Sequence, residues 1–170
     1  MPGRVDLKQA IADVPDFPRQ GILFRDISPL LRDHFDATLD ALDALLSREE
    51  WEQVDAVAGI ESRGFILGAA LAARRRKGFV LIRKQGKLPP PVVDVAYLLE
   101  YGSGVLEMQR GRGRVLLIDD VLATGGTMTA AGDLCERAGY TVQALAVLID
   151  LKLIPAYGWH ELPLRTVVSY

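Results

Sequence analysis

Residues 115–127 constrain the fold of this chain more than any other segment. Four consecutive apolar residues at 115–118 precede two aspartates, Asp119 and Asp120, and a turn of small residues follows. A strand that is apolar at every position is typical of one covered on both faces, as in a parallel sheet. A helix is expected over 128–138, because a glycine follows it. The segment therefore predicts a buried strand, a tight turn and a helix.

The same alternation of strand and helix extends through most of the chain. Apolar runs predict strands at 54–58, 79–82, 115–118 and 141–149. Helices are predicted at 6–13, 36–46, 65–73 and 128–138. Strands alternating with helices indicate an α/β fold with right-handed crossovers. We therefore expect a central, mostly parallel sheet flanked by helices.

Length and composition exclude several classes of protein. The 170 residues correspond to one domain, and no apolar run approaches the roughly 20 residues that span a bilayer. The net charge of −2 argues against a nucleic-acid-binding protein, and the basic run at 74–77 is expected to close a helix. Cys135 is the only cysteine, and neither His34 nor His160 has a partner at metal-ligand spacing. We expect a cytoplasmic protein that contacts neither nucleic acid nor membrane.

The turn after the buried strand has the composition of a phosphate site. Ligands of open α/β sheets bind beyond the carboxyl ends of the strands, and a helix start there offers free N–H groups. Asp119 and Asp120 can accept hydrogen bonds from sugar hydroxyls. The small residues and hydroxyls that follow are typical of a phosphate cradle: Ala123, Thr124, Gly125, Gly126 and Thr127. One strand end thus supplies both halves of a ribose 5-phosphate site.

Two competing phosphate motifs do not match this chain. The sequence contains no GxxxxGK[ST], so a P-loop nucleotidase is excluded. Gly111-Arg112-Gly113 precedes a strand instead of following one, and residue 116 is Leu where a dinucleotide fingerprint has glycine.

Residues 115–127 resemble the phosphoribosyl pyrophosphate signature of type I phosphoribosyltransferases. The resemblance implies the fold of that family, with a small hood and a mobile lid loop. It also implies that Asp119 and Asp120 hold the ribose hydroxyls, and that residues 123–127 hold the 5-phosphate.

Residues 16–31, DFPRQGILFRDISPLL, resemble the N-terminal motif of the adenine branch of that family. On the residues alone, Phe24 could lie in the core and Arg25 could pair with Asp26. The resemblance implies instead that Leu23, Phe24 and Arg25 bind adenine, with the ring stacking on the purine.

Two further segments resemble the same family. Residues 59–72 match its pyrophosphate loop, which implies that role for Glu61, Ser62 and Arg63, although many relatives have Asp in place of Glu61. Residues 82–89 and 99–102 match its mobile loop, with two departures, the prolines at 89–91 and an alanine at 96 where serine is usual. The resemblance assigns pyrophosphate to Arg83, Lys84, Lys87 and Tyr101, and acid/base chemistry to Glu100.

The resemblance implies transfer of the phosphoribosyl group from phosphoribosyl pyrophosphate to adenine, giving AMP. Mg²⁺ is the implied cofactor, held mainly by the substrate with no dedicated protein ligands, and a homodimer is the implied assembly. Residues 1–170 are expected to form one domain, with 1–35 as the base-binding hood and 83–113 as the lid. Two alternatives stay open: transfer to xanthine, hypoxanthine or guanine, and a non-enzymatic regulator that senses phosphoribosyl pyrophosphate.

Overall fold

The structure, a computed structural model, describes residues 3–99 and 102–170. In this part of the chain the strands are β1 (Ala12–Val14), β2 (Phe24–Asp26), β3 (Ala56–Ile60), β4 (Gly78–Lys84), β5 (Val93–Leu99), β6 (Gly102–Met108), β7 (Gly113–Leu122), β8 (Tyr140–Asp150), β9 (Gly158–Trp159) and β10 (Leu162–Ser169). The helices are α1 (Leu7–Ala10), α2 (Ser28–Asp33), α3 (Phe35–Asp43), α4 (Arg48–Glu52), α5 (Arg63–Arg74) and α6 (Gly126–Ala138).

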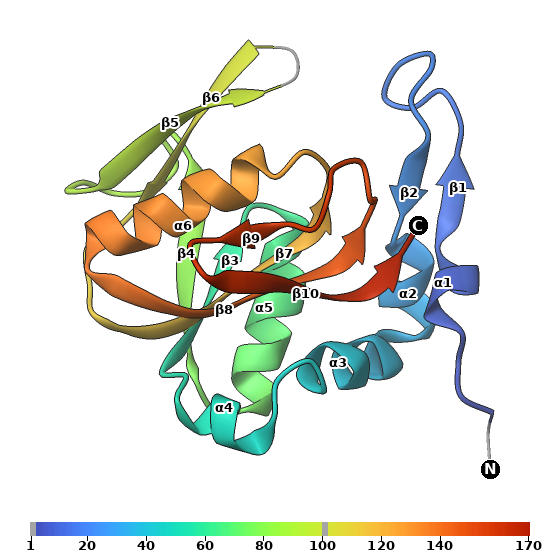
Figure 1. The fold of residues 1–170 in the computed structure, drawn as a ribbon, viewed down its shortest axis with the longest axis horizontal. Helices are drawn as coiled ribbons and strands as arrows, with labels where there is room; N and C mark the ends of the chain where they lie inside the picture. The colour runs from blue at the N-terminus through green and yellow to red at the C-terminus, as the bar shows by residue number, and fades with distance from the viewer. Residues whose placement is uncertain (1–2, 100–101) are drawn as a thin grey trace.

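Most of the described strands form one sheet in the order β5-β6-β4-β3-β7-β8-β10-β9 (Figure 1). The neighbours from β4 to β10 in that order are parallel, and the pairs at both edges are antiparallel. This confirms the predicted α/β fold with a mostly parallel sheet.

Helices cover both faces of the sheet, and the side chains of β7 alternate between them. Leu116 and Ile118 pack in the cluster that contains Leu67 and Leu71 of α5, whereas Leu117 packs in the cluster of α6. This alternation is the two-residue period of a strand. Burying one such side chain contributes about 1.5–3 kcal/mol. The strand is therefore covered on both faces, as its sequence predicts.

The basic run at the end of α5 ties this helix to α3. Nη1 of Arg74 donates to Asp40 at 2.6 Å. Arg75 donates to both carboxylate oxygens of Asp43, at 2.6 and 2.5 Å, and its guanidinium lies over the ring of Trp51. These arginines therefore join two helices, which goes beyond the helix-end role predicted for residues 74–77.

The predicted N-terminal helix over 6–13 is wrong in its second half. The helix covers only Leu7–Ala10, where the side chain of Asp6 accepts two backbone N–H groups. Residues 12–14 form β1, which pairs antiparallel with β2. Pairing with a segment 12 residues away overrides the local helical preference. The resulting hairpin stands beside the C-terminus of the chain in Figure 1.

The segment 83–113, expected as a mobile lid, contains a hairpin. β5 and β6 pair antiparallel, and β6 also pairs with the end of β4. In Figure 1 this hairpin projects from the end of the sheet opposite the β1–β2 hairpin. Glu100 and Tyr101 lie outside the described residues.

The C-terminal strands β9 and β10 have no counterpart in the predicted elements. β10 extends the sheet in parallel beside β8, and β9 folds back on it. Arg165 of β10 donates to both carboxylate oxygens of Glu50 in α4, at 2.7 and 2.6 Å. Among the described residues, no helix has the length and apolar character needed to cross a membrane.

Candidate active site

The carboxyl end of β7 carries the two aspartates predicted to bind a sugar. β7 continues to Leu122, so both aspartates lie within the strand. The backbone N–H of Asp120 donates to Oδ1 of Asp119 at 2.8 Å. The side chain of Asp120 is nearly buried and accepts a hydrogen bond from Nε of Arg63. The rim of the sheet therefore offers two carboxylates, one of which is paired with a cation.

The surroundings of Asp119 oppose its ionisation. Burial raises the pKa of Asp119 well above its usual range, and the negative charge of Asp120 raises it further. The guanidinium of Arg63 acts in the opposite direction. A carboxyl held in this way gains from a ligand that brings cations or hydroxyl donors to it.

The turn after β7 has the backbone geometry of a phosphate cradle. Gly125 has a φ of +88° and caps α6, which begins at Gly126, two residues before the predicted start. In the described chain no side chain caps this helix, so its first N–H groups lack a side-chain partner. Such groups, at the positive end of the helix dipole, are a ready anion site.

A second loop, between β3 and α5, meets the same rim. It contains Glu61 and Ser62, joined by a cis peptide bond, and α5 begins at Arg63. A Cβ at Gly64 would lie 3.1 Å from Oδ1 of Asp119, which shows how closely the helix start approaches the strand end. The first turn of α5 therefore adds a second helix N-terminus and a guanidinium beside the aspartates.

A cleft of about 430 Å³ joins these parts. The residues predicted to bind ribose, phosphate and pyrophosphate that line it are Glu61, Ser62, Arg63, Lys84, Asp119, Asp120, Ala123, Thr124, Gly125, Gly126 and Thr127. Side chains of the β5–β6 hairpin, Tyr97, Leu99 and Leu106, complete its wall. Most of the predicted site is thus gathered around one cavity.

Arg83 and Lys87, also predicted to bind pyrophosphate, lie outside the lining of this cleft. Nε of Arg83 donates to Glu61 at 2.7 Å, and its Nη1 contacts the carbonyl of Lys87 at 3.5 Å. Arg83 therefore links the second loop to the turn after β4, and the side chain of Lys87 is exposed.

The predicted base-binding residues lie in the β1–β2 hairpin and differ in their contacts. The guanidinium of Arg63, which lines the cleft, lies 5.3 Å from the ring centre of Phe24. The ring therefore contacts a residue of the cleft wall. Leu23 is about half exposed. Arg25 donates to Asp13 at 2.5 Å and lies 3.8 Å over the ring of Tyr170. Asp26, the alternative partner of Arg25, accepts hydrogen bonds from Ser28 instead.

Two residues beside the site were missed by sequence reasoning. A Cβ at Gly125 would lie 2.7 Å from the ring of Tyr157, whose hydroxyl is 2.7 Å from Oγ1 of Thr129. Tyr157 therefore packs against the turn between β7 and α6. The other is Glu107 of β6, which accepts backbone hydrogen bonds from the turn after β4. No local motif marks either residue, because both act across long sequence separations.

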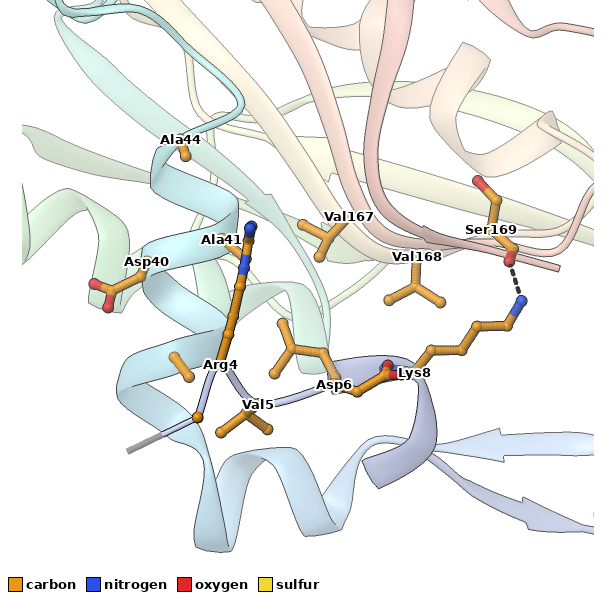
Figure 2. Close-up of a pocket in the computed structure, with 13 residues that line it drawn as sticks. Arg4, Val5, Asp6, Lys8, Asp40, Ala41, Ala44, Val167, Val168 and Ser169 are labelled. Carbon is orange, nitrogen blue, oxygen red and sulfur yellow. Dashed lines mark hydrogen bonds between the residues drawn. The ribbon is translucent and has the colours of Figure 1, made fainter. Parts of the chain in front are cut away.

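A larger groove of about 880 Å³ lies away from this rim, between residues 3–8, α3 and β10. Figure 2 shows Lys8 crossing one end of it to reach the carbonyl of Ser169 at 2.7 Å. Its floor is formed by small and apolar side chains such as Ala41 and Val168. It contains none of the predicted site residues.

Comparison with known proteins agrees with the geometry of the cleft. A family model described as a phosphoribosyl transferase domain matches residues 36–153, well over half of the chain. The matched region includes the end of β7, the phosphate turn and the second loop. The fold and the cleft thus define a phosphoribosyl transferase domain.

Individual relatives show to which family of phosphoribosyl transferases the chain belongs. A protein of Hydrogenovibrio crunogenus named adenine phosphoribosyltransferase is 51% identical to this chain over 96% of each chain. A protein of the same name from Bdellovibrio bacteriovorus is also 51% identical, over 98% of this chain and 100% of its own length. The crystal structure of adenine phosphoribosyltransferase from Rhodothermus marinus is 45% identical, with a TM-score of 0.82 over 96% of both chains. This chain belongs to the adenine phosphoribosyltransferase family.

A structural relative with ligands is also similar. The Saccharomyces cerevisiae adenine phosphoribosyltransferase, crystallised with an imino-altritol bisphosphate and adenine, has a TM-score of 0.86 and 35% identity. The comparison covers 95% of this chain and 96% of the yeast chain.

Proposed function

We propose that this protein transfers the 5-phosphoribosyl group from phosphoribosyl pyrophosphate to adenine, releasing pyrophosphate and forming AMP for purine salvage. The observation that carries the proposal is the shared cleft. Asp119 and Asp120 lie beside an amide-rich turn, and Arg63 and Lys84 line the same cavity. Family membership and the adenine-bound yeast relative support adenine as the acceptor.

The sugar and its phosphate occupy the end of β7 in this proposal. Asp119 and Asp120 accept hydrogen bonds from the two ribose hydroxyls. The N–H groups of residues 123–127 and the threonine hydroxyls of the turn donate to the 5-phosphate. Hydroxyl donors at the aspartates favour the charged form of Asp119, whose pKa is raised in the free protein.

The pyrophosphate end lies toward Arg63 and Lys84. Arg63 is paired with Asp120 and lies near Phe24. A polyanion in the cleft competes for this guanidinium, because a phosphate binds it bidentately. Transfer of Arg63 to the leaving group frees Asp120 for the ribose and the face of Phe24 for the base. Arg83 and Lys87 reinforce the charge from the turn after β4.

Mg²⁺ is the cofactor expected for this reaction, and the residues present suit a cation held chiefly by its substrate. Among the described residues no group of three or more His, Cys, Asp or Glu side chains could hold a metal ion. Asp119, Asp120 and Glu61 are carboxylates that line the cleft, and Glu61 is paired with Arg83. Mg²⁺ commonly combines few carboxylates with substrate phosphates. When bound, it supplies positive charge to the leaving pyrophosphate.

Adenine enters between the β1–β2 hairpin and the cleft. Phe24 stacks on the purine, the backbone of Leu23 contacts its edge, and Arg25 donates to a ring nitrogen. Glu100 manages the proton of adenine as the new bond forms. Displacement at the anomeric carbon proceeds through a transition state that resembles an oxocarbenium ion. The lid segment 83–113 excludes water, which would otherwise hydrolyse the substrate.

The expected assembly is a cytoplasmic homodimer of single-domain subunits. Ile66 of α5 and Leu81 of β4 are exposed apolar side chains that an interface could cover. The lone cysteine, Cys135, is buried, and burial raises the pKa of its thiol to about 12, which suits a structural role. Light scattering on the purified protein tests the dimer, and a monomeric mass would refute it.

Turnover with separate bases tests the proposed reaction. Purified protein is incubated with phosphoribosyl pyrophosphate, Mg²⁺ and each of adenine, hypoxanthine, guanine and xanthine. We expect pyrophosphate release and AMP formation with adenine alone. Preference for another base would reassign the acceptor, and binding of phosphoribosyl pyrophosphate without any turnover would indicate a regulator.

A further inference from the structure

Glu107 is a buried carboxylate for which the proposed reaction has no direct use. It lies on β6 opposite Arg83 of β4, and it is only 3% exposed. Its Oε1 accepts the backbone N–H groups of Lys87 at 2.8 Å and Leu88 at 2.7 Å. A buried carboxylate is costly unless hydrogen bonds compensate for its lost hydration. Although burial acts to raise the pKa of Glu107, these amide bonds and Arg83 keep it below its usual range.

The next polar side chain of the same strand end holds the other side of this turn. Nε2 of Gln109 donates to the carbonyl of Pro89 at 3.3 Å. Residues two apart on an extended chain share one face, so Glu107 and Gln109 contact the turn from the same side. The turn is thus held by Glu107 of β6 and by Gln109, which follows that strand.

This turn connects directly to the cleft. It follows Lys84, which lines the cavity, and it contains Lys87, which lies outside that lining. Arg83 joins it to the second loop through Glu61. Of the side chains described here, Glu107 is the one that bonds to two consecutive amides of the turn.

We propose that Glu107 is a positioning residue for pyrophosphate: its two hydrogen bonds fix residues 85–88 so that Lys84 and Lys87 stand at the pyrophosphate end of the cleft. This inference rests on the proposed function, because it assumes which ligand group lies there. Glu107 acts through the turn and touches no substrate atom.

The test combines Glu107→Ala and Glu107→Gln with binding, kinetics and hydrogen exchange. In Glu107→Ala we expect Kd for Mg²⁺-pyrophosphate and KM for phosphoribosyl pyrophosphate to rise about tenfold, from two lost charge-assisted hydrogen bonds. KM for adenine should stay within about twofold. Exchange of the Lys87 and Leu88 amides should accelerate. Glu107→Gln keeps an acceptor oxygen in place, so its changes should have the same direction and smaller size.

The matched control is Asp55→Asn. Asp55 also accepts a backbone N–H, from Arg114 at 2.8 Å, but it lies away from the cleft. It should lower Tm and leave pyrophosphate binding unchanged. If Glu107→Ala does not fold, the Gln variant decides.

Unchanged pyrophosphate binding in a folded variant with accelerated exchange would overturn the inference, as would equal weakening of adenine and pyrophosphate. Absence of turnover in the wild-type protein that still binds pyrophosphate would refute the proposed function alone.

Discussion

Arg63 lies between two groups of the proposed site. It donates to Asp120 and lies 5.3 Å from the ring centre of Phe24, so one guanidinium contacts both a carboxylate proposed to bind ribose and the ring proposed to stack on adenine. Asp119, beside it, is held in surroundings that disfavour its charge. A ligand that carries its own charges and hydroxyls would compensate for this arrangement, which otherwise lowers the stability of the fold.

The raised pKa of Asp119 predicts a trade of stability against activity. Asp119→Asn should raise Tm at neutral pH, by about 2–4 °C for each kcal/mol of relieved destabilisation, because the variant removes a carboxyl whose ionisation the fold opposes and keeps the acceptor for the Asp120 N–H. The wild-type protein loses stability as pH rises from the ordinary carboxyl pKa toward the raised pKa of Asp119, so the Tm difference should vanish at acid pH.

The same variant should lower kcat/KM for phosphoribosyl pyrophosphate about 10–100-fold, the cost of a lost charged hydrogen bond. Thermal scans from pH 4 to pH 8 and steady-state kinetics check both effects. A destabilised Asp119→Asn protein at neutral pH would contradict the electrostatic account.

The turn between β7 and α6 is the element proposed to bind the 5-phosphate. Its Gly125 combines a φ of +88° with the close approach of the Tyr157 ring. A side chain there meets both backbone strain and a steric clash, so the element tolerates no Cβ in its present form.

Gly125→Ala should therefore raise KM for phosphoribosyl pyrophosphate about tenfold or more, since both backbone strain and the clash displace the phosphate N–H groups. Gly139→Ala is the control, because Gly139 also has a positive φ, +107°, but ends α6 far from the turn. It should lower Tm and leave KM within about twofold. Equal kinetic effects of the two variants would show that the turn has no special role.

Elements with a local signature were predictable from the sequence, and those made by distant pairing were not. The strand, acid pair and glycine turn at 115–127 form one contiguous signal, so the strand, turn and helix at the end of β7 were predictable, while their ligand chemistry stays a prediction. The β1–β2 hairpin and the β5–β6 hairpin depend on partners that no short pattern specifies. Tyr157 and Glu107 were missed for the same reason, and Arg25 has partners, Asp13 and Tyr170, that sequence spacing does not indicate.

In the described part of the chain, an ion pair, a hydrogen bond and a cation–π contact join outer elements to the C-terminal segment. Arg165 of β10 pairs with Glu50 of α4, and Lys8 of α1 reaches Ser169 at the end of β10. The C-terminal Tyr170 lies against Arg25 of the β1–β2 hairpin. The last strand therefore connects the sheet to both α4 and the proposed base-binding hairpin.

The Arg165–Glu50 pair predicts a specific dependence of stability on pH. Hydrogen bonds from Arg165 and Ser47 lower the pKa of Glu50 from 4.5 to about 2. Because the folded-state pKa is depressed, the stabilisation is complete above about pH 4.5 and is lost as pH falls toward 2.

Glu50→Gln should lower Tm modestly at pH 7, since both side chains are partly exposed and screened. The difference from wild type should shrink on acidification, and KM values should be unchanged. A Tm difference that persists at pH 2 would show that packing, and not charge, is responsible.

The central claim is that one strand end holds the sugar and the turn beyond it holds the phosphate. A crystal structure of the protein with phosphoribosyl pyrophosphate and Mg²⁺ tests it most directly. We predict ribose hydroxyls within hydrogen-bond distance of Asp119 and Asp120, with the 5-phosphate bound by the N–H groups of residues 123–127. A 5-phosphate bound elsewhere, with this turn free of ligand, would contradict the account.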